Sequence, residues 1–186
     1  MLYTGKGDSG TSKLFDCSQG ERIGKDAVIF EALGRVDELT SYLGLCRVKA
    51  ETAEIELGSE MMAGIIEKIQ HNLFNVQAEL AGADKHLSDN NVKQLEDWIA
   101  RVEEEIPPLR SFTIPGGSEL SAELDVARTL VRRAERYVVA ILNEQPDRVS
   151  DNTLAYLNRL SSVFFALARL TNHRLGISEQ PPRYDS

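Results

Sequence analysis

The 186-residue chain lacks most features that mark extracellular, zinc-binding or membrane proteins. It has only two cysteines, Cys17 and Cys46, with no CxxC pair and no metal-finger spacing, which fits a reducing compartment. It opens without an apolar signal region or an arginine-rich leader, and no run of residues approaches the length of a membrane span. We therefore expect a cytoplasmic protein that does not engage a membrane.

The chain also lacks an excess of basic residues. Its 21 lysines and arginines stand against 29 aspartates and glutamates, a net charge of -8, which argues against nucleic-acid binding. The three histidines, His71, His86 and His173, occur singly, without an HExxH motif or paired spacing, so we expect no metal held by protein side chains. No Ser-His-Asp or Cys-His arrangement indicates a catalytic nucleophile either.

Strand signals are almost absent, because alternating runs are few and no Asn-Gly or Asp-Gly hairpin separates two apolar segments. Apolar residues instead recur at helical spacing, with a break at Pro107-Pro108 and a capping pair at Ser118 and Ser121. This predicts an all-α up-and-down bundle within a single domain (residues 1–186), where the bundle (27–175) follows a flexible glycine-rich arm (1–26) and precedes a loose tail (176–186). The five predicted helices cover about 27–49, 61–83, 91–106, 118–143 and 151–175.

The predicted fourth helix carries a dense group of arginines for an acidic protein. Arg128, Arg132, Glu135 and Arg136 are spaced i, i+4, i+7 and i+8, so they share one face beside an apolar stripe. A guanidinium group close to a packing face needs a partner, because an unpaired charge away from water is costly. The partners are either acids of the same protein or phosphates of a small ligand, and the spacing leaves both open.

The N-terminal arm, Thr4 to Lys13, interleaves glycines with hydroxyl side chains and lysines. Glycines let backbone N–H groups converge on an anion, while hydroxyls and lysines add hydrogen bonds and charge. The segment lacks the GxxxxGK[ST] pattern of a P-loop. Composition alone favours the other interpretation, a flexible polar terminus.

Polar residues on two other predicted helices also have two interpretations. Asp37 can lie at the edge of the first helix's apolar stripe and pair with an arginine of another helix or subunit, whereas Glu38 is expected on a solvated face. On the fifth helix, Asn158 and Ser162 face the same way, four residues apart. Asn158 can hydrogen-bond a nucleotide or tie two helices together, and spacing does not decide between these roles.

In their order along the chain, these segments resemble the PduO-type ATP:cob(I)alamin adenosyltransferase family, from Tyr3 to Asn172. The resemblance implies a five-helix bundle that assembles as a homotrimer, with each active site between two subunits. It implies ATP with Mg²⁺ as adenosyl donor and a reduced corrinoid as acceptor, whose cobalt(I) attacks the ribose C5′ carbon and expels triphosphate. The most specific matching segments are Pro115-Gly116-Gly117, Arg132-Arg133-Ala134-Glu135-Arg136 and Tyr156-Leu157-Asn158-Arg159-Leu160-Ser161.

The resemblance also implies roles for single residues. Arg132, Glu135 and Asn158 would be catalytic, and Phe112 would face the lower side of the corrin ring, displacing its axial base so that cobalt becomes reducible. Mg²⁺ would be held through the ATP phosphates. Arg128 would pair with Asp37 of the adjacent subunit. The ATP-binding residues would be Thr4, Gly5, Lys6, Gly7, Ser12, Lys13, Lys25, Arg132, Arg133, Ala134, Glu135, Arg136 and Asn158.

Three positions depart from the family pattern. Asp125 stands where histidine is common, Ser162 where aspartate is common, and Ser9 where lysine is usual. They motivate a second hypothesis, an ATP- or corrinoid-binding delivery protein of the same family with little transferase activity. A third is a helical interaction protein whose arginines close ion pairs between subunits. As an enzyme, the protein would depend on a reductase and pass its product to an adenosylcobalamin-dependent acceptor enzyme.

Overall fold

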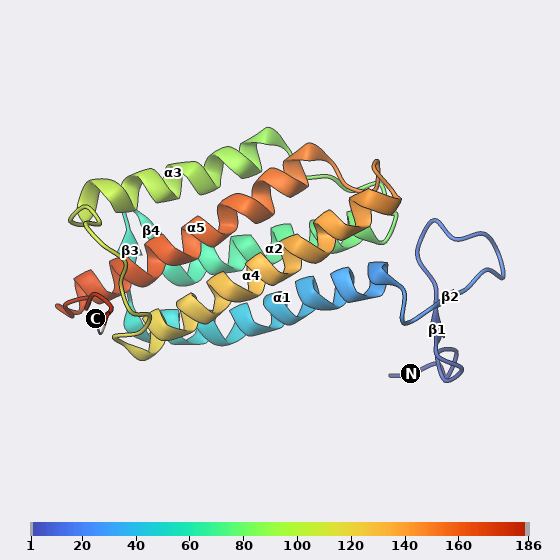
Figure 1. The fold of residues 1–186 in the computed structure, drawn as a ribbon, viewed down its shortest axis with the longest axis horizontal. Helices are drawn as coiled ribbons and strands as arrows, with labels where there is room; N and C mark the ends of the chain where they lie inside the picture. Colours follow the sequence, from blue (N-terminus) through green and yellow to red (C-terminus); the bar gives the residue numbers. More distant parts are fainter. Residues whose placement is uncertain (1, 185–186) are drawn as a thin grey trace.

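In the computed structural model, which describes residues 2–184, five long helices form an up-and-down bundle (Figure 1). The predicted all-α bundle is confirmed, with helix ends displaced by a few residues. None of the helices in the described range is both long and apolar enough to cross a membrane. The helices are α1 (Val28–Ala53), α2 (Met62–Leu80), α3 (Asp89–Glu105), α4 (Glu119–Glu144) and α5 (Asp151–Arg174).

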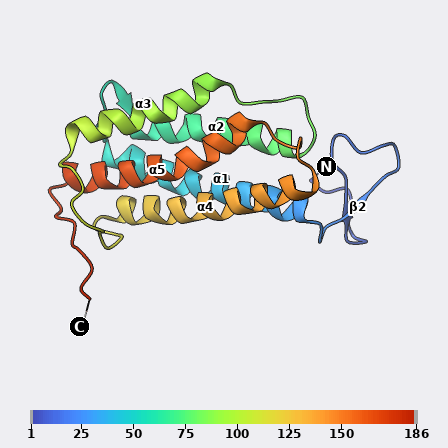
Figure 2. The same cartoon turned by 45° about the horizontal axis from the view of Figure 1, so that its top comes forward.

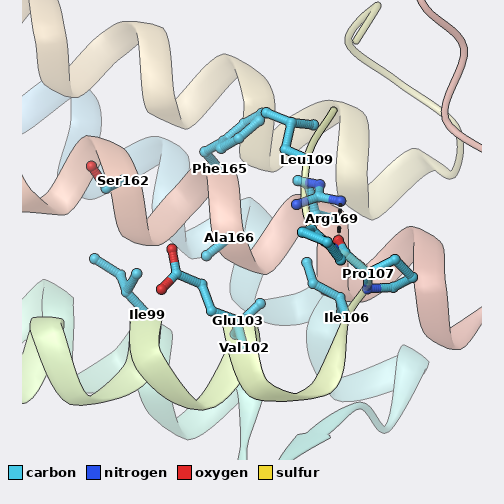
Figure 3. A pocket seen from close by; sticks show the side chains of 11 residues that line it. Ile99, Val102, Glu103, Ile106, Pro107, Leu109, Ser162, Phe165, Ala166 and Arg169 are labelled. Atoms are coloured by element: carbon cyan, nitrogen blue, oxygen red, sulfur yellow. Dashed lines mark hydrogen bonds between the residues drawn. The ribbon is translucent and has the colours of Figure 1, made fainter. Parts of the chain in front are cut away.

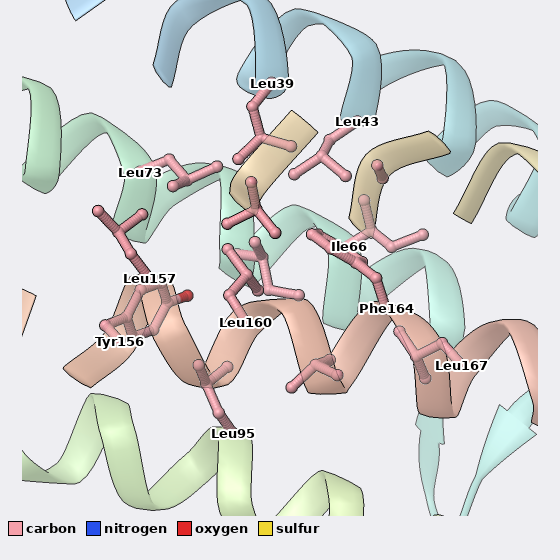
Figure 4. Packing of buried hydrophobic residues seen from close by; sticks show 14 of the residues in the cluster. Leu39, Leu43, Ile66, Leu73, Leu95, Tyr156, Leu157, Leu160, Phe164 and Leu167 are labelled. Carbon is pink, nitrogen blue, oxygen red and sulfur yellow. The ribbon is translucent and has the colours of Figure 1, made fainter. Parts of the chain in front are cut away.

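The bundle is held together by the apolar face of each helix. α1 packs on α2 and α4, and α5 packs on α4 and α3, so α4 lies between α1 and α5. Leu39 and Leu43 of α1 and Leu160 and Phe164 of α5 are fully buried in the shared core (Figure 4). Burying side chains of this size contributes roughly 1.5–3 kcal/mol each, which gives the outer faces of α1, α4 and α5 a stable frame.

The helix ends follow from local chemistry. Ser118 and Ser121 form the predicted cap of α4: the Ser121 backbone N–H donates to the Ser118 hydroxyl (3.1 Å), and the Ser118 N–H donates to the Ser121 hydroxyl (3.0 Å). α1 continues past the expected Lys49 to Ala53 and ends where Glu54 adopts a left-handed conformation, with φ 49°.

Two short antiparallel strand pairs accompany the helices, in line with the scarcity of strand signals in the sequence. In the arm, β1 (Thr11–Ser12) pairs with β2 (Ile23–Gly24), and between α1 and α2, β3 (Glu56–Leu57) pairs with β4 (Glu60–Met61). Strands of two residues are too short to produce the alternating pattern by which a strand is recognised in sequence. The arm is therefore folded back on itself rather than irregular throughout.

The start of the tail is also attached, contrary to the expectation that it is loose. The Ile114 N–H donates to the carbonyl of Gln180 (2.8 Å), and the Ile177 N–H donates to the carbonyl of Asn172 (2.9 Å). The tail thus returns to the loop that precedes α4 before it leaves the bundle (Figure 2).

Candidate functional site

The outer face of α4 presents two arginines to solvent. Arg132 and Arg136 are exposed, whereas Val131 and Ala134 of the same turns are buried in the core. Within residues 2–184 neither of these two guanidinium groups has a hydrogen-bond or ion-pair partner. They are therefore accessible cations on a rigid helix, as a site for an anionic ligand requires.

Arg133, for which the resemblance implies a role in ATP binding, meets an acid of the same chain. Its Nη2 lies 2.6 Å from Glu38 Oε2 of α1, and Arg35 contacts the same carboxylate at 3.2 Å. Burial alone would raise the pKa of Glu38, but the hydrogen bonds from Arg35 and Arg133 hold it below its usual value. The expectation that Glu38 lies on a solvated face is confirmed, because it is exposed, and α4 brings a second arginine to it there.

Glu135 and Asn158 join α4 to α5. The side-chain amide of Asn158 donates to Glu135 Oε1 at 2.8 Å, which confirms that Asn158 ties the two helices together. Asn158 is also exposed, beside the arginine face. Each side chain thus holds the other in one orientation at the surface, as residues that position a ligand need to be held.

Asp125 links the first turn of the arginine helix to the turn before it. Its Oδ2 accepts a hydrogen bond from the Gly116 N–H (3.2 Å), and its Oδ1 lies 3.4 Å from Arg128 Nε.

The turn before α4 requires glycine at its second position. Gly117 has φ +119°, and a Cβ there would lie 2.3 Å from Asn172 Oδ1.

Arg128 therefore has an acidic partner inside its own chain. Asp37, its expected partner from an adjacent subunit, is exposed on α1 and makes no ion pair with any residue in the range 2–184. The pair between subunits stays a prediction, because only one chain is present.

The arm closes on itself through hydrogen bonds, most of them from basic side chains. Lys25 Nζ donates to the carbonyl of Gly7 (3.1 Å), and the Thr4 hydroxyl accepts from the Lys6 N–H (3.4 Å). Arg22 donates to both the hydroxyl and the carbonyl of Thr11, at 2.8 Å each. Sequence reasoning missed Arg22, since it stands outside the glycine-rich stretch and its partner is eleven residues away.

One chain does not bring the predicted ATP-binding residues together. The arm lies beyond the end of the bundle where α1 begins, in both views, while residues 132–136 lie in the middle of α4 (Figures 1 and 2). Among the described residues, no hydrogen bond or ion pair joins Thr4–Lys25 to Arg132–Arg136. The expected nucleotide contacts thus form two separate groups, one on the arm and one on α4 and α5.

An apolar pocket lies between α3 and α5, and its lining includes residues 107–109, just before Phe112 in the chain. Phe112 itself is 80% exposed on the loop before α4, and the pocket, about 510 Å³, opens next to the start of that loop (Figure 3). Ser162, one of the departures, lines it beside Phe165 and Arg169.

Arg169 holds the rim of this pocket and was missed by sequence reasoning. It donates to the carbonyl of Pro107 (3.0 Å) and to Glu179 (2.9 Å), so it fixes both the loop and the tail. The available signal was a single charged residue inside the apolar run of α5. In the part of the chain that the structure describes, no three His, Cys, Asp or Glu side chains gather to hold a metal ion.

Comparisons with known proteins agree over almost the whole chain. The model of the cobalamin adenosyltransferase family matches residues 2–171. A corrinoid adenosyltransferase of Bacillus subtilis is 38% identical over 182 residues, covering 96% of this chain and 90% of the relative. A corrinoid adenosyltransferase of Citrobacter freundii is 41% identical over 176 residues, covering 91% of this chain and 93% of the relative.

Solved structures agree as well. A variant of the PduO-type ATP:corrinoid adenosyltransferase from Lactobacillus reuteri, complexed with cobalamin and ATP, matches with a TM-score of 0.85 and 29% identity. The match covers 99% of this chain and 100% of that chain.

Proposed function

The chain belongs to the cobalamin adenosyltransferase family, and we propose that it transfers the 5′-deoxyadenosyl group of ATP to the cobalt of reduced cob(I)alamin. The products would be adenosylcobalamin and triphosphate. The observation that carries this proposal is the family match over residues 2–171, because it spans both the arm and the α4–α5 face. We propose residues 1–186 as one domain of this kind.

The proposed reaction asks for positioning and charge stabilisation rather than acid–base chemistry. The Co–C bond forms as the C5′–O bond breaks, and the electron pair leaves with the triphosphate. Arg132 and Arg136, exposed on α4, are suited to stabilise the negative charge that develops on this leaving group. Glu135 and Asn158 would hold ATP in one orientation, and Mg²⁺ would be held by phosphate oxygens.

We place each active site between two copies of the chain in a homotrimer. This is supported by the separation of the arm from the α4 face within one chain, because a second copy could supply the missing half. Arg128, now paired with Asp125, would then meet Asp37 of the adjacent copy.

Mass measurement in solution tests this assembly. We expect a particle of three times the 20.7 kDa chain mass. Asp37→Lys should shift it toward smaller species, because two cations would then face each other across the interface. Combining Asp37→Lys with Arg128→Asp should restore the trimer. A monomer at every protein concentration, in the unaltered chain, would contradict the assembly.

Phe112 is proposed to contact the corrin ring, and its exposure makes a clean test. Phe112→Ala should lower the transfer rate roughly 10- to 100-fold, because the corrinoid loses the group that positions its lower face. The thermal unfolding midpoint should not change, since the side chain is not in the core. Phe74→Ala, which removes another exposed phenylalanine on α2, is the matched control and should leave the rate unaltered. Equal rates for both variants would rule out the assigned role.

The function itself is tested by mixing the protein with MgATP and cob(I)alamin without oxygen. Appearance of the adenosylcobalamin spectrum supports the enzyme, and its absence at every protein concentration contradicts it. ATP binding without turnover would favour the delivery protein, in which case restoring Asp125→His and Ser162→Asp should raise turnover strongly. No ATP binding at all would favour the interaction protein. For the enzyme, we place the reaction in the cytoplasm, between a corrinoid reductase and an adenosylcobalamin-dependent acceptor enzyme.

A further inference from the structure

Besides its chain connection to α1, the arm contacts the bundle through residues 14–16. Leu14 is buried in the core, and the Phe15 N–H donates to the carbonyl of Ala81 at 2.8 Å, just beyond the end of α2. Gly82 has φ +84°, and a Cβ there would lie 2.4 Å from the carboxyl carbon of Asp16. The arm therefore approaches this turn so closely that only glycine fits.

One guanidinium group joins the three segments that meet at this place. Arg148, in the connection between α4 and α5, donates from Nε to the carbonyl of Leu80 (2.8 Å) and from its two terminal nitrogens to the Asp16 carboxylate. Its side chain is only 10% exposed. The Leu80 carbonyl belongs to the last turn of α2, where carbonyls lack helical N–H partners and a cation is favourable.

The connection that carries Arg148 is itself held in place. The buried carboxylate of Glu79 accepts from the Ser150 N–H at 2.7 Å and from the hydroxyl of Thr153, in the first turn of α5. Val149, next to Arg148, is buried. Arg148 is thus aimed at the arm by the bundle, and the planar fork of its guanidinium can serve a carboxylate and a carbonyl at once.

From this geometry we propose that Arg148 is a positioning residue that fixes the nucleotide arm to the bundle and so sets the affinity for ATP without touching it. The inference rests on the proposed function, because it takes the arm to bind ATP. The proposed phosphate-binding residues lie on both sides of the attached segment, Thr4 to Lys13 before it and Lys25 after it.

Loss of the attachment should act on binding rather than on the chemical step. When only a fraction of molecules hold a binding-competent arm, the apparent affinity falls by that fraction. We expect Arg148→Ala to raise the KM for ATP about tenfold and to leave kcat within about twofold, as the loss of one charge-assisted attachment would. Arg148→Lys should give an intermediate KM, since lysine keeps the charge without the fork.

Amide hydrogen exchange of residues 4–26, measured without ATP, reports the attachment independently of activity. It should be faster in Arg148→Ala and in Asp16→Asn, while the amides of α3 keep their protection. Asp16 is 44% exposed, so Asp16→Asn removes the charge and one acceptor of the same contact while it keeps the bond from Arg148 to α2. Arg101→Ala, which breaks the pair between Arg101 of α3 and Glu60 of β4, far from the arm in sequence, is the control and should change neither exchange nor KM.

The outcomes separate the two proposals. Unchanged exchange in the arm of both variants would overturn the attachment. Faster exchange with an unaltered KM for ATP would leave the attachment standing and contradict ATP binding by the arm. If Arg148→Ala fails to fold, arm exchange and the KM for ATP in Asp16→Asn are sufficient to test the attachment.

Discussion

Arg132→Ala is expected to lower kcat/KM for adenosyl transfer by roughly 10²- to 10³-fold, the usual cost of removing one fixed group that stabilises developing charge. Arg132 is exposed and, within residues 2–184, has no partner that it could be holding in place. Its removal should therefore leave the unfolding midpoint unaltered. Initial rates of adenosylcobalamin formation, with ATP and corrinoid varied in turn, measure the effect.

Two further variants make this result specific. Arg132→Lys should recover part of the rate, because it keeps the charge but not the bidentate geometry. Arg174→Ala is the control. It removes the last residue of α5, an arginine that pairs with Glu105 of α3, and this variant should have the rate of the unaltered protein. A normal rate in Arg132→Ala would remove this side chain from the proposed reaction.

Glu79→Ala is expected to lower the free energy of unfolding by about 3 kcal/mol, which is large for one residue. Glu79 is 4% exposed, and its loss leaves the Ser150 N–H and the Thr153 hydroxyl without their acceptor at the first turn of α5. The same turn also loses a negative charge that suits a helix N-terminus. Urea unfolding followed by circular dichroism measures the change.

Glu67→Ala on the same helix is the matched control for Glu79→Ala. Glu67 forms an exposed pair with Arg47, at 3.0 Å, and such pairs contribute little. Similar losses in the two variants would show that burial and hydrogen bonding do not distinguish Glu79.

The contact between Glu79 and His86 adds a pH dependence with a defined sign. Burial by itself would raise the pKa of Glu79, but hydrogen bonds from Thr153, His86 and Ser150 lower it below the usual 4.5. The stability that Glu79 contributes is therefore present above that usual value and is lost as pH falls through the lower value in the folded state. The hydrogen bond to Glu79 raises the pKa of His86 above its usual 6.5, so its contribution is present below 6.5 and is lost as pH rises through the higher folded value.

The two shifts together define the window in which the pair stabilises the protein. The difference in unfolding midpoint between the unaltered protein and His86→Ala should be larger near about pH 6 than near about pH 9, because the imidazole is charged only at the lower value. A constant difference across this range would contradict the pairing.

Much of the candidate site was visible in the sequence because its parts are local. The arginine face of α4 and the Asn158 face of α5 follow from helical spacing, and the Ser118–Ser121 cap follows from residue types three positions apart. The features that the sequence did not reveal are either very short elements or contacts between residues far apart in the chain. β1 and β2 are two residues each, and Arg148 reaches Asp16 across 132 positions.

The sequence by itself determined the five helices, the family and the set of charged residues on α4, because periodicity and motif order are properties of neighbouring positions. Only the tertiary structure decided how those charges are used. Arg132 and Arg133 are adjacent in sequence, but the packing of α1 against α4 places Glu38 beside Arg133 and leaves Arg132 exposed. Arg128, by contrast, meets Asp125 three positions earlier on the same helix, and the tertiary structure adds only the Gly116 N–H of the preceding turn to that carboxylate. Helical spacing specifies which face a side chain occupies, whereas its partner depends on which other helix or loop covers that face.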